Sequence, residues 1–528
     1  MSKIDTIDFT TPYIDRRVAE GIFRELFGEH SLYRVFNIYG KSGSGKTTFI
    51  NHIRNKYLNK SDIVTIRIDF NNRLLHKSQN TIMHIAKELE DKYDFNFIAL
   101  WKAYAILWHK RYENSPLMYA IDLPYFNEIK KIINPKKGNK IINIAKNIFG
   151  DKTSKELEEL KNLDSNAIEE SLHKFFATDI RRVLKDKKIK DCVIIFENLD
   201  ILKENINGTP CSKDDWIRDI ITQIGKDALF ILTSKEQLNW QKCNSNWKSL
   251  LKSYEMKPFT QKDSLRYLRL SGIDNKNLKE AIAKSSGNEP FWLSLALLAN
   301  KELENNLPIS KKDILNSFIK SLNKNILDVL KILVHTRFFT IDLLYVASRK
   351  FEISISKDDI TELLNLPFIK ELDDNKLIID DTLKDEFIKK QTKKEIAEYR
   401  SFIFSYYENI LQSIDTHVVE ATPKLIDEVL EEAWYHLNLI NQEPLVHYEW
   451  LDYYIDRFYM FAAWEPFVER YSKIIPQLKE AKDSTSKSKL ISIYNNLAGL
   501  YESLGDRKIS KKYYNMVTKL NRPQLLSA

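Results

Sequence analysis

The sequence has few cysteines and glycines, no long apolar run and little excess charge. Its three cysteines, Cys192, Cys211 and Cys243, have neither metal-ligand spacing nor the even number of a disulfide framework, which fits a reducing cytosol. The longest apolar windows, such as FIALWKAYAILW, are interrupted by Lys102 before they could cross a membrane. The N-terminus lacks the apolar stretch of a signal peptide. We therefore expect a soluble cytoplasmic protein with no membrane partner.

Charge gives no strong indication of a partner, because 81 basic and 73 acidic residues leave a formal net charge of only +8. Lysines are spread along the whole chain, as on ordinary solvated faces. Nucleic-acid binding is therefore possible but not favoured. At 528 residues the chain is too long for one core, so we expect two to four domains.

Four short apolar runs have the composition of buried strands. They are rich in β-branched and aromatic residues, are bounded by polar turns, and cover residues 35–39, 63–70, 192–198 and 228–234. Helical patterns separate them. Strands that alternate with helices in this way predict a parallel sheet with helices on both faces.

A glycine-rich motif, GKSGSGKT, follows the first of these runs and precedes a helical pattern, which is the context that a phosphate-binding P-loop requires. Its glycines let backbone N–H groups face phosphates, Lys46 reaches the β- and γ-phosphates, and the Thr47 hydroxyl binds Mg²⁺. Only 13 glycines occur in the chain, so a chance match is improbable. The predicted nucleotide-binding residues are Gly40, Lys41, Ser42, Gly43, Ser44, Gly45, Lys46, Thr47 and Thr48.

The third run ends in two acids, in the sequence VIIFENLDIL. A P-loop protein needs an acid on a neighbouring strand to hold Mg²⁺ and a second group to orient the attacking water. Glu197 is predicted as the metal-side acid and Asp200 as the water-orienting group. Since Glu is one methylene longer than the usual Asp, we expect slow hydrolysis. The alternative interpretation is an ordinary polar end of a strand.

The fourth run ends in Thr-Ser-Lys, residues 233–235. A polar residue at this point lies beside the γ-phosphate in P-loop proteins, so Lys235 is a candidate catalytic residue that senses the charge of that phosphate. The alternative is that these residues only begin a loop.

Patterns along the rest of the chain suggest the domain organisation. The nucleotide-binding domain is expected at 1–260, with a helical insert at about 97–190. The insert contains a basic segment, 129–149, which is either a solvated loop and helix or a patch for nucleic acid or another partner. After 260 the pattern becomes helical, which predicts a lid domain at 261–308. Three helices and two short extended runs then predict a winged helix at 309–398.

Residues 399–528 read as pairs of helices. The segment 493–523 has aromatic, small and Gly residues near the spacing of a 34-residue helical repeat, and Ala498 and Ser510 would allow two helices to cross closely. Such repeats stack and usually present a concave peptide-binding surface. The alternative is a cap that only packs on the winged helix.

The order of these motifs resembles the STAND class of P-loop NTPases, and within it the bacterial ATP-binding proteins with C-terminal tetratricopeptide (TPR) repeats. The resemblance rests on the P-loop, on IDFNN after the second run, on LTSKEQLNW at the fourth, and on SGNEPFWLSLALLA. It implies an α/β P-loop NTPase domain with an AAA-like parallel sheet, followed by a helical lid, a winged helix and α-helical TPR-like repeats. It also implies an ADP-bound resting state, exchange for ATP, assembly on activation, and a role in signalling or bacterial defence against phage.

The resemblance also assigns roles to residues outside the motif. The segment PYIDRR implies that Tyr13, Ile14 and Arg16 pack against the adenine, and Pro290 would begin the lid helix that closes over the nucleotide. This sequence departs from the family at several positions. Glu197 replaces an Asp, Lys235 replaces an Arg and so loses the bidentate fork, and the segment before Pro290 is one residue longer.

The winged helix departs further. Where the family often has a His against the ADP phosphate, this sequence offers Asp380 and Asp381, which would weaken an ADP-locked state unless Lys384 or a metal compensates.

These features predict a slow ATPase that uses ATP or ADP and Mg²⁺ as a molecular switch. Its TPR-like repeats would bind a protein ligand or an effector supplied by another chain, and activation would produce a homo-oligomer. An alternative is an AAA-type ATPase or transcription regulator that reads DNA with its winged helix, although the acidic segment DDNKLIIDDTLKDEF is unsuited to phosphate contacts. A small-molecule kinase would leave the helical C-terminal half unexplained.

Overall fold

The computed structural model describes residues 12–28, 33–112, 159–187, 189, 191–202, 214–372, 375–414, 423–461, 463–481 and 483–521. The chain folds into two compact units, each built from two segments that are distant in sequence. Unit 1 comprises Met1–Phe95 and Arg181–Ile396, and unit 2 comprises Asn96–Ile180 and Ala397–Ala528.

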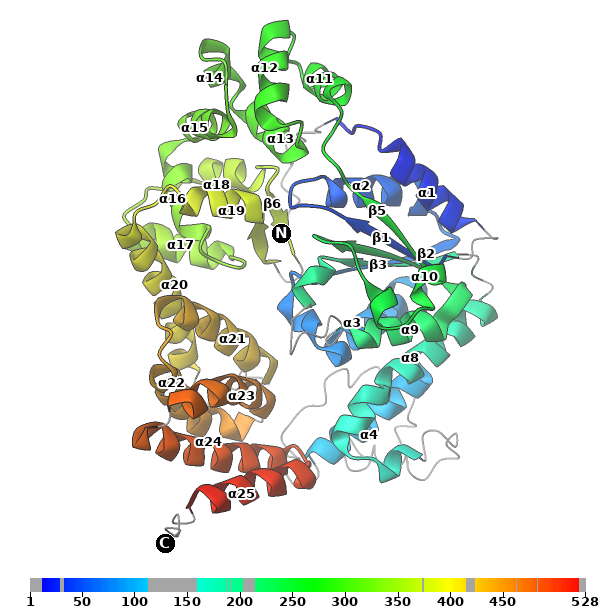
Figure 1. Ribbon diagram of the computed structural model, residues 1–528, viewed down its shortest axis with the longest axis vertical. Coiled ribbons are helices and arrows are strands. Elements are labelled where there is room, and N and C mark those ends of the chain that lie inside the picture. Colours follow the sequence, from blue (N-terminus) through cyan, green and yellow to red (C-terminus); the bar gives the residue numbers. More distant parts are fainter. Residues whose placement is uncertain are drawn as a thin grey trace. The chain divides into compact units, whose positions relative to one another are not determined.

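Unit 1 is built on a five-stranded parallel sheet in the order β2-β3-β4-β1-β5 (Figure 1). The strands are β1 (Val35–Tyr39), β2 (Ile63–Asp69), β3 (Asp191–Glu197), β4 (Leu229–Ser234) and β5 (Leu251–Glu255). Four of them match the apolar runs, which confirms the predicted parallel α/β fold. β5 was not predicted because its sequence, LKSYE, is polar and only partly buried, as suits an edge strand.

Helices cover both faces of this sheet. On one face, α1 (Arg17–Phe27) and α2 (Lys46–Ile53) bury Phe23 and Phe49 in a core with Phe36 and Ile195 of the strands. On the opposite face, the Trp216 ring of α9 (Asp215–Ile224) packs 6.1 Å from the ring of Phe196. The other helices of this part are α3 (Ser78–Tyr93) and α10 (Trp247–Leu250), and the π-helix η1 (Arg54–Leu58) extends α2.

A helical segment follows the sheet. It contains α11 (Gln261–Leu270), α12 (Lys276–Ser286), α13 (Pro290–Leu298), α14 (Asn300–Asn305) and α15 (Lys311–Ser321). Side chains cap several of these helices: Thr260 accepts from the Asp263 N–H, and Ser310 forms a capping box with Asp313. α13 begins at Pro290 and is apolar on most sides, because it lies inside this segment.

The next elements have the order expected of a winged helix. They are α16 (Lys324–Leu333), α17 (Ile341–Lys350), α18 (Lys357–Leu364), the antiparallel strands β6 (Ile369–Glu371) and β7 (Leu377–Ile379), and α19 (Asp381–Ile388). A backbone bridge between Phe339 and Leu377 joins the start of α17 to the hairpin. α20 (Lys393–Ser413) then leads from unit 1 into unit 2.

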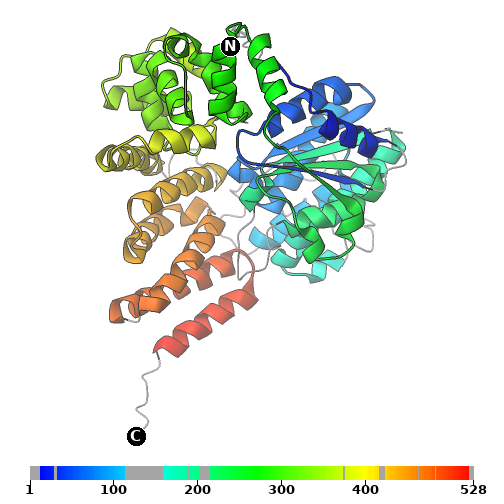
Figure 2. The same cartoon turned by 45° about the horizontal axis from the view of Figure 1, so that its top comes forward.

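Unit 2 combines part of the insert with the C-terminal helices. The insert supplies α4 (Ile98–Tyr112) and the first part of α8 (Ser165–Asp186), and the C-terminal region supplies α21 (Pro423–Ile440), α22 (Pro444–Phe458), α23 (Trp464–Ala481), α24 (Ser484–Ser503) and α25 (Arg507–Asn521). Figure 2 shows the C-terminal helices, coloured orange to red, stacked one after another. Ala498 and Ser510 are buried between α24 and α25, as small residues at a close crossing should be. The domain limits drawn from the sequence stay predictions.

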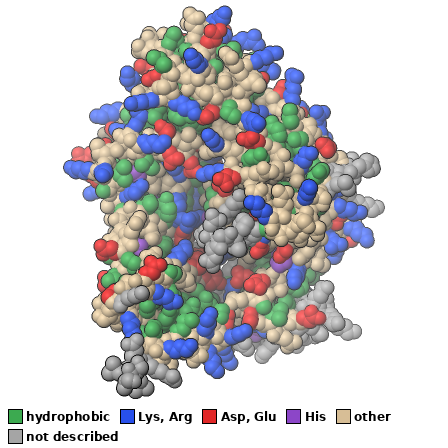
Figure 3. Space-filling view, viewed as in Figure 1, with side chains coloured by type: hydrophobic (Ala, Val, Ile, Leu, Met, Phe, Trp, Pro, Cys, Tyr) green, Lys and Arg blue, Asp and Glu red, His purple; other side chains and the backbone are tan. Residues whose placement is uncertain are grey.

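The surface charges and the helices bear on the expectations for nucleic-acid binding and for a membrane partner. Figure 3 shows Lys and Arg scattered over the visible face among Asp and Glu, without a single basic patch. None of the described helices is both long and apolar enough to cross a membrane. The Cys192 thiol is free and buried. Cys211 and the basic segment 129–149 lie outside the described residues.

Candidate nucleotide site

The P-loop connects the end of β1 to the start of α2, and its glycines are required by its geometry. Gly43 has φ +71°, and a Cβ added to it would lie 2.5 Å from the Cβ of Phe291. Gly45, the residue before the first turn of α2, has φ +94°. Both conformations are rare for residues with a side chain. The N–H groups at the start of α2 follow this loop directly and form a site suited to anions.

Lys46 is the first residue of α2, and its ammonium group bends back over the loop. Nζ donates to the Gly40 carbonyl oxygen at 2.6 Å and to that of Lys41 at 3.0 Å. Burial lowers the pKa of Lys46 to about 8, although the carboxylates of Asp200 and Asp380 act in the opposite direction. A phosphate at this position would supply the negative charge that favours the charged form of Lys46.

Thr47 and Glu197 face each other across the gap between α2 and the end of β3. The Thr47 hydroxyl donates to Glu197 Oε2 at 3.3 Å. Glu197 is 1% exposed, and its other oxygen forms an ion pair with Arg67 Nε of β2 at 2.6 Å. Burial raises the pKa of Glu197, and the charge of Arg67 opposes this effect. Glu197 therefore has one oxygen at the P-loop and one on a cation.

Mg²⁺ suits this donor set. It prefers oxygen ligands, and with nucleotides it usually takes one or two protein groups, with phosphates and water completing its shell. The hydroxyl of Thr47 and the carboxylate of Glu197 are such groups, whereas no cluster of three or more His, Cys, Asp or Glu side chains suited to a metal occurs among the described residues. The residues fit Mg²⁺ with a nucleotide rather than a metal held by protein alone.

Asp200 and Lys235 meet where β3 and β4 end. Asp200 Oδ1 accepts from the backbone N–H of Lys235 at 2.8 Å, so the carboxylate fixes the turn after β4. Asn198, at φ +60°, supports the same edge: its N–H donates to Thr233 Oγ1 at 3.0 Å and its amide donates to Asp69 Oδ1 at 2.7 Å. These contacts hold the polar ends of three neighbouring strands together.

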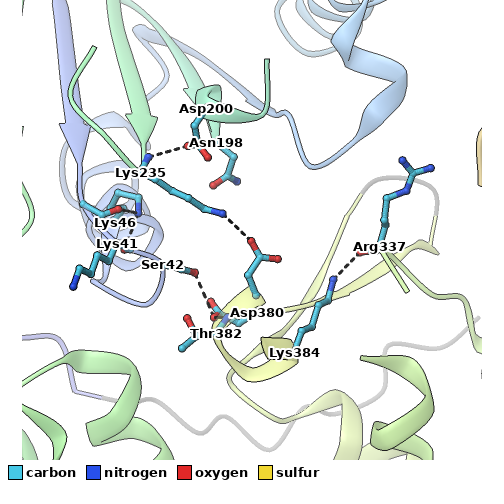
Figure 4. A network of polar contacts seen from close by, with 12 residues as sticks. Lys41, Ser42, Lys46, Asn198, Asp200, Lys235, Arg337, Asp380, Thr382 and Lys384 are labelled. Carbon is cyan, nitrogen blue, oxygen red and sulfur yellow. Dashed lines mark hydrogen bonds and ion pairs between the residues drawn. The ribbon is translucent and has the colours of Figure 1, made fainter. Parts of the chain in front are cut away.

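The start of α19 also lies at this site (Figure 4). The Ser42 hydroxyl of the P-loop donates to Asp380 Oδ1 at 3.5 Å, and Lys235 Nζ lies 3.2 Å from Asp381 Oδ2. Burial lowers the pKa of Lys235, but the carboxylates of Asp381, Asp200 and Asp385 together outweigh burial and the net change is upward. Lys384 donates to the Arg337 carbonyl oxygen at 3.1 Å. Lys235, in the turn after β4, is thus the cation that pairs with Asp381.

The lead-in segment lies against the P-loop through Arg16. Its guanidinium donates to the carbonyl oxygens of Ser44, at 3.1 Å, and Lys257, at 2.8 Å, and lies 4.3 Å over the Phe259 ring. Burial lowers the pKa of Arg16. Ile14 is buried, and Tyr13 stacks on His52 with 3.8 Å between the ring centroids. Burial also raises the pKa of Tyr13 to about 12.

α13 contacts the loop from the other side. Pro290 Cγ would lie 3.9 Å from a Cβ on Gly45, and the Phe291 N–H donates to the Gly43 carbonyl oxygen at 3.2 Å. The Phe291 ring lies 5.7 Å from that of Phe368, beside β6. The first turn of α13 is therefore in contact with both the P-loop and the winged-helix segment.

The structure places Arg16, Pro290 and Glu197 in contact with the P-loop, and Asp200 and Lys235 at the ends of the neighbouring strands. Tyr13 instead stacks on His52, in the last turn of α2. The roles of all these residues stay predictions.

The structure adds two partners that sequence reasoning missed. Arg67 lies in a strand where a charged residue interrupts the apolar run, and that interruption was the available signal. Phe291 follows Pro290 in an ordinary apolar helix, so nothing in the sequence distinguished it.

The sequence matches no protein-family model and no curated protein. Among solved structures, the chain is similar to a signal-transduction ATPase with numerous domains (STAND) that carries a tetratricopeptide repeat sensor, from Pyrococcus horikoshii. The TM-score is 0.44 at 14% identity, over 96% of this chain and 64% of that one. The chain therefore spans less than two thirds of that protein's length.

Two further similar structures have lower scores. One is a Walker-type ATPase of Pyrococcus abyssi, with a TM-score of 0.31 at 13% identity, over 71% of this chain and 96% of that one. The other is the Aeropyrum pernix ORC1 protein in complex with DNA, at 0.32 and 12% identity, over 72% of this chain and 94% of that one.

Proposed function

We propose that this chain is a P-loop ATPase that works as a nucleotide-controlled switch of the STAND type. The observation that carries the proposal is the P-loop itself, in which Thr47 lies 3.3 Å from the buried carboxylate of Glu197 on the neighbouring β3. A hydroxyl and an acid at this distance, beside Lys46 at a helix N-terminus, form the parts that hold a nucleotide triphosphate with Mg²⁺. A structural loop would have no need of them.

In the proposed reaction, each part of the site has one task. The backbone of residues 40–47 and Lys46 bind the β- and γ-phosphates, and Thr47 with Glu197 would hold Mg²⁺, which neutralises charge on the phosphates. Asp200, whose Oδ1 fixes the Lys235 turn, would orient the attacking water through its other oxygen. Water attacks the γ-phosphorus, the bond to the β,γ-bridging oxygen breaks, and ADP and phosphate are released. Since Glu197 is one methylene longer than the usual Asp, we expect turnover to be slow.

The switch would act through elements that touch the P-loop. α13 donates from Phe291 to Gly43, and α19 contacts Ser42 through Asp380. A nucleotide that changes the loop therefore has two direct routes to the lid and to the winged-helix segment. Tyr13, Ile14 and Arg16 would contact the base, with Pro290 at the edge of the same loop.

Unit 2 would sense the trigger, and the output would lie in a partner chain or in assembly itself. The stacked helices of unit 2 support a role as a sensor for a protein ligand, or as the surface for an effector in another chain, and activation would then proceed by nucleotide exchange and assembly into a homo-oligomer. A defence role against phage, in the cytoplasm, is the setting that the resemblance implies.

DNA reading by the winged helix is the less favoured function. The second helix of a helix-turn-helix normally enters the major groove, and the corresponding α18 exposes Asp358 and Glu362 beside its only basic residue, Lys357. Acids at this position oppose contact with DNA phosphates. A steep salt dependence of DNA affinity would revive this alternative.

The proposal is tested by nucleotide binding to a Lys46→Ala variant. Lys46→Ala removes the cation at the phosphates, so ATP and ADP should no longer bind measurably in calorimetry, whereas Lys60→Ala, an exposed lysine beyond α2, should bind as the wild type does. Normal ATP binding by the Lys46 variant would overturn the assignment of the site.

A further inference from the structure

Two consecutive acids at the start of α19 have different partners: Asp380 caps the helix and accepts from Ser42, whereas Asp381 pairs with Lys235. Asp380 is the N-cap of α19, since its Oδ1 accepts from the Thr382 N–H at 2.9 Å. A capping residue is expected there for the stability of the helix alone. Asp381 makes no such cap, and its contact is with Lys235, which directly follows β4.

Lys235 is the residue that a third phosphate would meet. It follows β4 directly, and β4 lies between β1, which leads into the P-loop, and β3, which ends in Glu197. Asp200, the predicted water-orienting group, binds the backbone of Lys235 itself. The Lys235 ammonium therefore extends from the part of the site that the γ-phosphate would occupy, and it donates to Asp381.

Carboxylates already lie near both lysines of this site. Lys46 is influenced by Asp200 and Asp380, and Lys235 by Asp381, Asp200 and Asp385. A diphosphate on the P-loop needs Lys46 and the backbone but not Lys235. A triphosphate needs Lys235 as well, so it must break the ion pair with Asp381 and place negative charge beside the released carboxylate.

We propose that Asp381 is a specificity-determining residue: by holding Lys235, it disfavours the binding of nucleoside triphosphate relative to diphosphate. This inference rests on the proposed function. The side chains of Lys235 and Asp381 are 51% and 57% exposed, so solvent screens the pair and its own contribution is small, about twofold to fivefold in affinity. Repulsion between the carboxylate and the γ-phosphate acts in the same direction.

The test compares two nucleotides on one variant. The Kd values of ADP and of a non-hydrolysable ATP analogue, both with Mg²⁺, are measured by calorimetry for the wild type and for Asp381→Asn. The variant should bind the ATP analogue about threefold or more tightly than the wild type, with ADP affinity changed less than about twofold. Lys235→Met should weaken the analogue, and in the Lys235→Met background Asp381→Asn should have a smaller effect.

A matched control lies on the same helix. Glu386 pairs with Lys389 at 2.6 Å, so Glu386→Gln removes one negative charge from α19 without touching Lys235. It should leave the ratio of the two Kd values unchanged. An unchanged ratio in Asp381→Asn, or an equal gain for both nucleotides, would overturn the inference while leaving the nucleotide site intact. Failure of the wild type to bind either nucleotide would instead contradict the proposed function.

Discussion

At the scale of single residues, the buried carboxylate of Glu197 has two partners with opposite consequences. Thr47 brings it to the P-loop, where a metal-side acid belongs, while Arg67 supplies a cation that already neutralises it. Removing one member of a buried pair leaves an uncompensated charge, which is costly. Arg67 is therefore expected to stabilise the site between rounds of nucleotide binding, and the charge of Glu197 to matter for turnover.

Replacement of Glu197 by Gln tests this division of roles. Glu197→Gln keeps the shape and removes the charge, so nucleotide binding should persist while Mg²⁺-dependent phosphate release falls about 10- to 100-fold, as when a group that orients metal ligands is lost. Steady-state phosphate release and the Kd of ATP are the two measurements. Unchanged turnover would show that Glu197 is not the metal-side acid.

Arg67→Met is the comparison for that experiment. It keeps Glu197 and removes only the cation, so turnover should stay within a few-fold of the wild type. Equal loss of turnover in both variants would instead mean that the ion pair acts by holding the fold of the site.

The distance along the chain between interacting groups decides which contacts could be predicted from the sequence. The P-loop is a local motif, because its ligands are consecutive backbone groups between a strand and a helix, and the acids that end β3 are predicted by their position after an apolar run. Arg67, Phe291 and the pairing of Asp381 with Lys235 depend on contacts between distant segments. No spacing in the sequence records such contacts.

At the scale of elements, the same limit explains why the packing partner of the insert could not be predicted. Helices were expected at 97–190, but periodicity gives no information about what a helix packs against. In unit 2 the described part of the insert binds the turn between α24 and α25: Ser165 Oγ donates to the Leu504 carbonyl oxygen at 3.2 Å, and the Asn166 amide donates to Asp506 Oδ2 at 2.6 Å. Arg111 adds an ion pair with Glu465 at 2.7 Å.

Gly505 lies at the centre of this contact and gives its sharpest test. It has φ +79°, and an added Cβ would lie 2.5 Å from the Lys110 carbonyl oxygen. Gly505→Ala should lower the free energy of unfolding by about 1–3 kcal/mol, through backbone strain and the displaced α4. Gly499→Ala, in α24 with open space around the new Cβ, should be neutral or stabilising by up to about 1 kcal/mol. Chemical denaturation measures both.

A second substitution separates strain from contact. Asn tolerates positive φ better than Ala but still carries a Cβ, so Gly505→Asn should remain clearly less stable than the wild type. Full recovery of stability in Gly505→Asn would mean that the turn does not press on α4.

At the scale of the whole molecule, nucleotide state and assembly should be linked. The pairing of Asp381 with Lys235 favours the diphosphate, and the contacts of α13 and α19 with the P-loop depend on what the loop holds. Protein purified from cells should therefore release ADP on denaturation and have the mass of one chain by light scattering. A non-hydrolysable ATP analogue should raise that mass, more readily in Asp381→Asn, while Lys46→Ala should stay monomeric under both conditions.

Release of ATP from an already assembled protein would contradict the preference for diphosphate, because control would then have to come from the helices of unit 2 or from a partner. A single-chain mass with either nucleotide would contradict assembly driven by nucleotide alone, and would place the trigger in a protein ligand.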